Sequence, residues 1–228
     1  MRQIEDFFDL TDFPFADLFD GVDSVWDALD RIGSYIAQRE SYVIDGEVSP
    51  GAWLAGERIA IGAGSVVEPG AMITGPALIG RNCVIRNGAY LRGNVIAGDG
   101  ALIGHTTEVK NSIFLNGAKA AHFAYVGDSI LGRNVNLGAG TKLANFKLET
   151  GNRNVTLDAG GARIDSGRRK MGAILGDGVE LGCNCVTMPG TLIGARSLAY
   201  PCCVLRGAIP PNSIIKLKQN LSVTERKS

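Results

Sequence analysis

The sequence predicts a parallel β-solenoid, a chain that coils so that its short strands stack into parallel sheets. Aliphatic residues recur every six positions, as at Ile61, Val67, Ile73, Ile79 and Ile85. Six residues fit one short strand and one corner, but they do not fit a helical period. Glycine contributes 31 of the 228 residues and proline only 8, which indicates many tight corners without a disordered composition.

The repeat covers most of the chain, and its first position is expected to point into a narrow core. In chain order the predicted inward residues are Ile61, Val67, Ile73, Ile79, Ile85, Leu91, Ala97, Ile103, Val109, Leu115, Ala121, Leu131, Leu137, Leu143, Leu175, Leu181, Thr187, Ile193, Ala199 and Leu205. The second position is often glycine, which suits a corner with unusual φ and ψ. Only ten residues separate Ala121 from Leu131, so we expect the register to slip just after His122.

Three segments are predicted from these patterns: residues 1–41, the solenoid over 42–209, and a C-terminal tail over 210–228. The first segment is acidic, and Ser24 to Arg39 reads as an amphipathic helix with Ser24 as N-cap. We expect this helical segment to cap the open end of the solenoid. An arm that docks a partner is the alternative. Pro210 and Pro211 are expected to end the repeat.

Charge and composition exclude several classes of function. The 23 basic and 23 acidic residues give a formal charge of +0, so no nucleic acid or anionic membrane is expected as partner. The acidic start, and the lack of an apolar run of ~18–20 residues, favour a cytoplasmic protein. Five cysteines are then expected to be reduced thiols. Catalytic zinc generally needs three protein ligands, and with only His105 and His122 we expect no metal site.

Departures from the repeat cluster between residues 86 and 145. Arg92 and Lys110 are 18 residues apart, which is one coil of three hexads, so they should stack at ~4.8 Å. Two cations this close repel each other, and a bound phosphate between them would relieve the repulsion. Solvated charges on a sheet edge are the alternative. By the same spacing, Arg86, Gly104 and His122 should share a column, in which the glycine leaves space above His122.

The stretch from residue 107 to 147 carries a family resemblance. The motif residues are Glu108, Lys110, Lys119-Ala120-Ala121-His122, Tyr125, Gly127, Asp128, Asn136, Gly138-Ala139-Gly140-Thr141 and Asn145. They resemble the acetyltransferase domain of the bifunctional glucosamine-1-phosphate acetyltransferase/N-acetylglucosamine-1-phosphate uridyltransferase. Residues 165–194 resemble related sugar-1-phosphate nucleotidyltransferases. The likeness to these hexapeptide-repeat transferases implies a left-handed, three-sided β-helix and a homotrimer.

The resemblance also implies roles for individual residues in an N-acetyltransferase that uses acetyl-CoA and an amino-sugar phosphate. His122 would be the general base, and Glu108 would orient its ring. The implied substrate-binding residues are Arg92, Lys110, Tyr125, Asn136, Asn145 and Lys170, with Arg169 as an alternative to Lys170. The backbone N–H of Ala139 would meet the thioester oxygen, and Cys183 stands near the cofactor.

Two departures from the family qualify this interpretation. Ala121 replaces the glycine of the family's K-A-G-H, so the pocket is expected to be narrower. Residues 146–170 form an insertion that we expect to be a hairpin over the site. The chain lacks the Gly-rich nucleotide-binding half, so we expect no nucleotidyltransferase activity in it and a separate nucleotidyltransferase as a possible partner. A non-catalytic protein that binds a sugar nucleotide or assembles with that partner is the alternative function.

Overall fold

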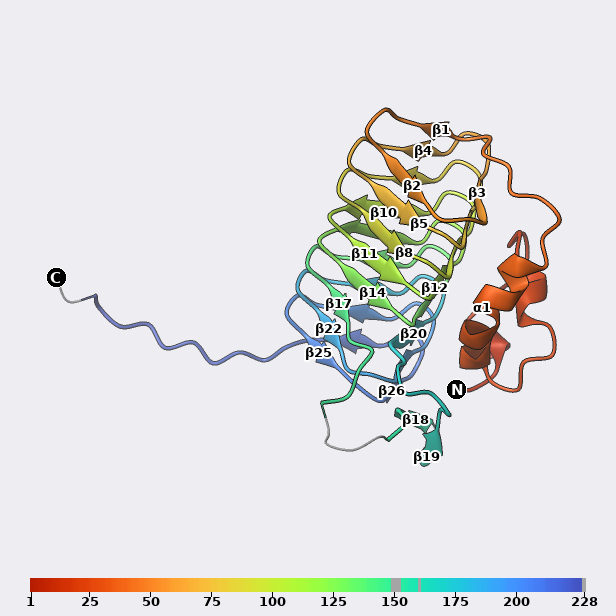
Figure 1. Cartoon of the computed structure of the whole chain (residues 1–228). Helices are drawn as coiled ribbons and strands as arrows, with labels where there is room; N and C mark the ends of the chain where they lie inside the picture. Colours follow the sequence, from red (N-terminus) through yellow and green to blue (C-terminus); the bar gives the residue numbers. More distant parts are fainter. Residues whose placement is uncertain (149–152, 160, 227–228) are drawn as a thin grey trace.

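The computed structural model is a three-sided parallel β-helix with a helical segment along one side (Figure 1). The structure describes residues 1–148, 153–159 and 161–226. The chain contributes a strand to each of three sheets in turn, here named sheets I, II and III. It then returns to sheet I one coil further along the axis, and the coil is left-handed. This confirms the fold class predicted from the hexads.

Each sheet is a ladder of parallel strands from successive coils. Sheet I contains β1 (Glu47–Val48), β4 (Val66–Val67), β7 (Val84–Ile85), β10 (Leu102–His105), β13 (Lys119–His122), β16 (Asn136–Leu137), β21 (Glu180–Leu181), β24 (Leu198–Ala199) and β27 (Ile214–Ile215). Sheet II contains β2 (Trp53–Ala55), β5 (Met72–Thr74), β8 (Tyr90–Arg92), β11 (Glu108–Lys110), β14 (Tyr125–Gly127), β17 (Lys142–Leu143), β22 (Val186–Thr187) and β25 (Val204–Leu205). The strands are short because a corner follows each one.

The third sheet differs from the other two because both of its faces are covered. Sheet III contains β3 (Ile59–Ile61), β6 (Ala77–Ile79), β9 (Val95–Ala97), β12 (Ser112–Phe114), β15 (Ile130–Leu131), β20 (Ala173–Leu175), β23 (Thr191–Ile193) and β26 (Ala208–Ile209). Its outward residues include Ile96, Ile113 and Ile130, which pair in register and are fully buried. Such a face needs another apolar element against it.

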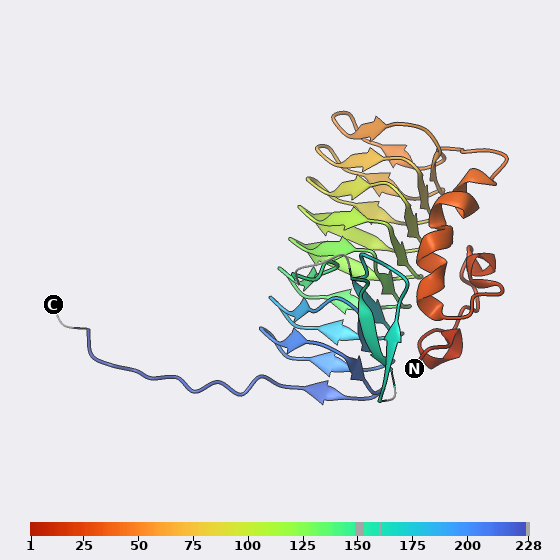
Figure 2. The same ribbon diagram turned by 60° about the horizontal axis from the view of Figure 1, so that its bottom comes forward.

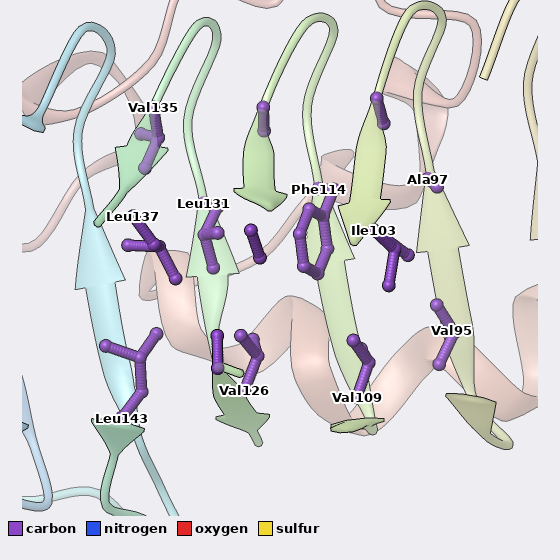
Figure 3. Close-up of a cluster of buried hydrophobic side chains, with 14 of the residues drawn as sticks. Val95, Ala97, Ile103, Val109, Phe114, Val126, Leu131, Val135, Leu137 and Leu143 are labelled. Atoms are coloured by element: carbon purple, nitrogen blue, oxygen red, sulfur yellow. The ribbon is translucent and has the colours of Figure 1, made fainter. Parts of the chain in front are cut away.

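Inward side chains fill the narrow space between the three sheets (Figure 3). The predicted inward residues up to Val109 are confirmed, but Leu115 and Ala121 are wrong. Phe114 and Ala120 occupy the inner core instead, and Leu115 packs in the outer apolar cluster. The inward spacing is therefore five residues from Val109 to Phe114 and again from Val126 to Leu131. Each shortening removes one residue from the corner between sheets II and III.

Residues 1–41 lie along sheet III and not over the open end of the solenoid, which corrects the predicted position of this segment (Figure 2). The segment contains η1 (Ile4–Asp6), η2 (Ala16–Phe19), η3 (Val25–Asp27) and α1 (Ala28–Ala37). The helix predicted from Ser24 is confirmed, and the Ser24 backbone N–H donates to Asp27 Oδ2 at 2.9 Å. Leu29, Ile32 and Ile36 are buried against the outer face of sheet III, because that face offers apolar area and the open end does not.

The insertion and the C-terminal end complete the fold. β18 (Thr156–Ala159) and β19 (Ala162–Asp165) form the predicted hairpin (Figure 2). It packs near β23 and β26 of sheet III, so its predicted position over the site is wrong. The prediction that Pro210 and Pro211 end the repeat is wrong, since β27 pairs with β24 beyond them. Both prolines fit a corner, where a fixed φ and a missing donor are tolerated. Within the described part of the chain, no helix is long and apolar enough to cross a bilayer.

The burial of α1 predicts that the helical segment contributes strongly to stability. Ile32 is 0% exposed, so Ile32→Ala should lower the free energy of unfolding by about 2–5 kcal/mol. Ile214, which is 67% exposed, is the matched control, and Ile214→Ala should change it by less than about 1 kcal/mol. Urea denaturation followed by circular dichroism measures both. Equal effects of the two substitutions would contradict the packing described for α1.

Candidate functional site

The residues singled out in the sequence fall into two groups at opposite edges of sheet II. The first group lies at the corner between sheets II and III, where β8 ends at Arg92, β11 ends at Lys110, and Asn145 follows β17. The second group lies at the corner between sheets I and II, where β13 ends at His122. Tyr125, on β14, lies between the two corners. The width of one short strand therefore separates the two groups.

The two cations of the first group stack as predicted but already have acidic partners. Tyr90 pairs with Glu108 and Leu91 with Val109, which places Arg92 beside Lys110. Arg92 donates to Glu108 Oε1 at 2.6 Å. Lys110 Nζ lies 3.4 Å from both carboxylate oxygens of Asp128. No anion is therefore needed to relieve their repulsion, because each cation has a carboxylate on the neighbouring coil.

Asp128 organises this corner, and the sequence analysis gave it no role. Its carboxylate is 3% exposed and accepts hydrogen bonds from Asn111 Nδ2 at 2.9 Å and Asn145 Nδ2 at 2.6 Å, besides the Lys110 contact. The φ angles of Asn111 and Asp128 are 46° and 48°, a left-handed conformation that asparagine and aspartate tolerate better than most residues. The motif pair Gly127-Asp128 was the signal that could have identified this residue.

Tyr125 is held among these polar groups with its phenol protonated. Burial raises the pKa of the Tyr125 phenol above its ordinary value, and the nearby carboxylates of Glu108 and Asp128 add to the rise. A hydrogen bond with Asn145 partly offsets it. At neutral pH the Tyr125 hydroxyl is thus available as a donor to an anionic or sugar oxygen.

His122 pairs with a different neighbour from the one predicted. The register places it beside His105, and Gly104 lies beside Ala121. The shortened corner after Val109 causes this shift, because it makes the coil 17 residues long instead of 18. A Cβ on Gly104 would lie 1.7 Å from the Ala121 carbonyl oxygen, so this glycine permits close approach of the coils at Ala121 and does not lie above His122.

The His122 side chain is exposed at the corner between sheets I and II, beside an aromatic side chain. Its centroid is 6.3 Å from that of Phe123, which is 53% exposed. Within the described ranges no hydrogen bond joins His122 to Glu108, whose carboxylate accepts from Arg92. The expected orienting contact is therefore not formed in this structure.

The residues that the family resemblance implies for binding the acyl donor lie on the coils after His122, at the same corner. Ala120 pairs with Leu137, which places Ala139 beside His122 on the next coil. No hydrogen bond to another described residue uses the Ala139 N–H, whereas the neighbouring Gly140 N–H donates to the His122 carbonyl oxygen at 3.1 Å. Cys183 is exposed on the following coil, and the Asn184 N–H donates to the Ala139 carbonyl at 2.8 Å. A free backbone donor next to an imidazole is suited to an oxyanion.

Two further predicted residues lie outside these groups. Asn136 is exposed on β16 in sheet I, where it pairs with Lys119 and Glu180, so it is not gathered with Asn145. Lys170 is exposed and lies next to Met171, whose N–H donates to the Asn145 carbonyl oxygen at 2.9 Å. Across residues 1–148, 153–159 and 161–226, no group of three or more His, Cys, Asp or Glu side chains is placed to hold a metal ion.

Curated relatives align with parts of the chain. A protein of Sulfurisphaera tokodaii described as "Bifunctional sugar-1-phosphate nucleotidylyltransferase/acetyltransferase" is 44% identical over 87 residues, which are 38% of this chain and 21% of that protein. A "Bifunctional protein GlmU" of Methanococcus maripaludis strain C7 is 37% identical over 114 residues, 50% of this chain and 27% of that protein. The chain thus matches about a quarter of the length of these relatives.

A solved structure and a family profile complete the comparison. The Francisella novicida UDP-N-acetylglucosamine acyltransferase covers 78% of this chain and 66% of its own with a TM-score of 0.44 and 15% sequence identity. The profile described as "GMPPB C-terminal domain" matches residues 73–209, which include both groups at the edges of sheet II. Because this match covers more than half of the chain, the chain belongs to the family of the GMPPB C-terminal domain.

Proposed function

We propose that this protein is an acetyl-CoA-dependent N-acetyltransferase that acts on an amino-sugar phosphate. The observation that carries the proposal is the placement of a cation cluster and an exposed histidine at opposite edges of one narrow sheet. Arg92 and Lys110 would bind the phosphate, while Asn145 at the same corner and Tyr125 between the two corners would bind the sugar. Asn136 and Lys170 remain proposed substrate contacts. Both lie outside the two groups, so a neighbouring subunit or a bound substrate would have to bring them closer to the site.

The acetyl transfer would take place at the second edge, beside His122. The neutral amine of the sugar attacks the thioester carbonyl carbon, and His122 accepts the proton that the amine loses. The Ala139 N–H donates to the oxygen that becomes negative. When the C–S bond breaks, the imidazolium returns its proton to the departing thiolate. The proton is thereby carried from nitrogen to sulfur, and the products are an N-acetyl sugar phosphate and free CoA.

Cys183 and the coils that follow would hold the pantetheine arm of acetyl-CoA along the same corner. The unpaired state of the described cysteines, of which Cys183 and Cys202 are exposed, is compatible with a reducing cytoplasm. No nucleotidyl transfer is assigned to this chain, and a separate nucleotidyltransferase would be its metabolic partner.

We also propose that the protein is a homotrimer. Residues 1–41 and the hairpin cover sheet III, which leaves sheets I and II for contacts between subunits. The outward column of sheet II has exposed apolar residues toward its two ends, Trp53, Tyr90 and Val204, which are 69%, 39% and 67% exposed, and it has Glu108, Tyr125 and Lys142 between Tyr90 and Val204. Exposed apolar residues in one column are typical of an interaction surface.

Replacing the proposed base should abolish most acetyl transfer. His122→Ala is expected to lower the rate at least about 100-fold, since a positioned general base contributes that much. The release of CoA thiol with glucosamine-1-phosphate as acceptor measures the rate. Because the side chain is exposed, the melting temperature should hardly change. Retained turnover would contradict the assignment, and so would loss of folding.

The cation cluster predicts stabilisation by a sugar phosphate. Glucosamine-1-phosphate should raise the melting temperature of the wild type as its concentration rises above Kd. Arg92→Met should remove most of this response with little change in the basal melting temperature, because the Arg92–Glu108 pair is exposed.

Two controls accompany this measurement. Arg226→Met, in the exposed tail, should keep the full response. Lys110→Met is less suitable than Arg92→Met, because it removes the cation from the buried Asp128 and should itself destabilise the fold. A full ligand response in Arg92→Met would rule out this phosphate site.

The oligomeric state gives an independent test. Light scattering at micromolar concentration should yield three times the 24.0 kDa of one chain. Val204→Arg should lower this mass, because it places a charge in the outward column of sheet II. Val223→Arg, in the tail and 93% exposed, should not. A wild-type monomer would contradict the trimer, and an unchanged mass for Val204→Arg would exclude this surface.

A further inference from the structure

A groove between the insertion hairpin and the solenoid adjoins the site described above. Its volume is about 1020 Å³, and its lining includes Phe146, Lys147, Asp158, Arg163, Met188 and Arg206. Figure 2 shows the β18–β19 hairpin lying against the later coils of the solenoid. The size is sufficient for a ligand of several rings or phosphate groups.

The groove is built into the fold because the hairpin is fixed at its base. A Cβ on Gly190 would lie 2.8 Å from Val155 Cγ1, so the first strand of the hairpin rests directly on this corner. Leu157 is 0% exposed in the outer apolar cluster. The Val155 N–H donates to the Arg168 carbonyl oxygen at 2.8 Å, and this hydrogen bond joins the two ends of the insertion. These contacts fix the base of the hairpin against the solenoid.

The charge of the groove favours an anion. Lys147, Arg163 and Arg206 contribute three cations, and Asp158 contributes one acid. Lys147 Nζ donates to Thr156 Oγ1 at 2.9 Å, which fixes its position. Among the described residues, no acid lies within ion-pair distance of Arg163 or Arg206. An excess of two positive charges matches a diphosphate better than a neutral sugar.

An aromatic ring adjoins these cations. Phe146 is 43% exposed, and the Arg169 guanidinium lies 5.1 Å from its centroid. Met188, also 43% exposed, adds apolar surface to the same groove. Such a ring and its stacked guanidinium offer a platform for a planar base. Cations together with a stacking surface are the combination that recognises a nucleoside diphosphate.

We propose that this groove binds the nucleoside diphosphate of a nucleotide-linked amino sugar, an inference that rests on the proposed function. Ala144 and Phe146 line the groove and flank Asn145, so it begins where the proposed sugar site ends. The nucleotide of acetyl-CoA has the same chemistry, but Ala139 and Cys183 lie at the other edge of sheet II. The groove therefore extends the site from the corner between sheets II and III, where the phosphate would bind.

Isothermal titration of the full chain with UDP, GDP and inorganic pyrophosphate tests the groove. At least one nucleoside diphosphate should bind more tightly than pyrophosphate, because the base adds stacking. Arg163→Gln should weaken this binding about tenfold, as expected for a lost charge-assisted contact. Phe146→Ala should weaken nucleoside diphosphate binding but not pyrophosphate binding. Arg226→Gln is the matched control and should bind as the wild type does. Equal affinity of the wild type and both groove variants for every probe would overturn the proposal.

Acetyl-CoA distinguishes the two sources of the nucleotide. The proposal predicts that acetyl-CoA and the nucleoside diphosphate bind together, and that Arg163→Gln leaves the Kd for acetyl-CoA unchanged. Displacement of the nucleoside diphosphate by acetyl-CoA, with a weaker acetyl-CoA Kd in Arg163→Gln, would overturn it. Both experiments measure binding, so their results do not depend on whether the protein catalyses acetyl transfer. If the wild type binds the nucleoside diphosphate here but acetylates no amino sugar, the proposed function fails while the groove's affinity stands.

Discussion

Every coil of this protein must return its backbone to the same three hydrogen-bonded ladders, and the rest of the structure depends on this constraint. A strand cannot gain or lose a residue without turning its side chains to the other face. A corner can gain or lose a residue, because it lies between the hydrogen-bonded ladders. The chain shortens two corners between sheets II and III, after Val109 and after Val126, and inserts residues 146–170 at a third. The proposed phosphate cluster and the groove both lie at this series of corners.

The shortened corners determine which polar groups meet. One missing residue places His122 beside His105 and lets Asp128 reach Lys110, Asn111 and Asn145. The buried carboxylate then holds the ends of three successive coils at one point. Sheet II carries this cluster at one edge and the His122 column at the other, so a ligand across the sheet could touch both. The helical segment on sheet III leaves this face uncovered.

Sequence periodicity was sufficient to predict the fold class and most of the inward residues, because an aliphatic side chain every sixth position allows few arrangements. Leu115 and Ala121 were assigned to the wrong face, since Phe114 and Ala120 are equally apolar and only the ladder decides between them. The position of α1 could not be predicted, because its amphipathic pattern shows that one face is buried but not which surface covers it. Departures from the repeat brought Arg92, Lys110 and His122 into consideration, and the resemblance gave them roles. The pairing of both cations with carboxylates could not be predicted, because it depended on coil length.

The central claim is that an amino-sugar phosphate lies across sheet II with its phosphate at one edge and its amine at the other. A crystal structure of the assembled protein with CoA and glucosamine-1-phosphate tests it most directly. We expect the phosphate within hydrogen-bond distance of Arg92 or Lys110, the amine near the His122 ring, and the CoA sulfur beside Ala139. Phosphate bound away from the cation cluster, or CoA sulfur at the corner between sheets II and III, would contradict it.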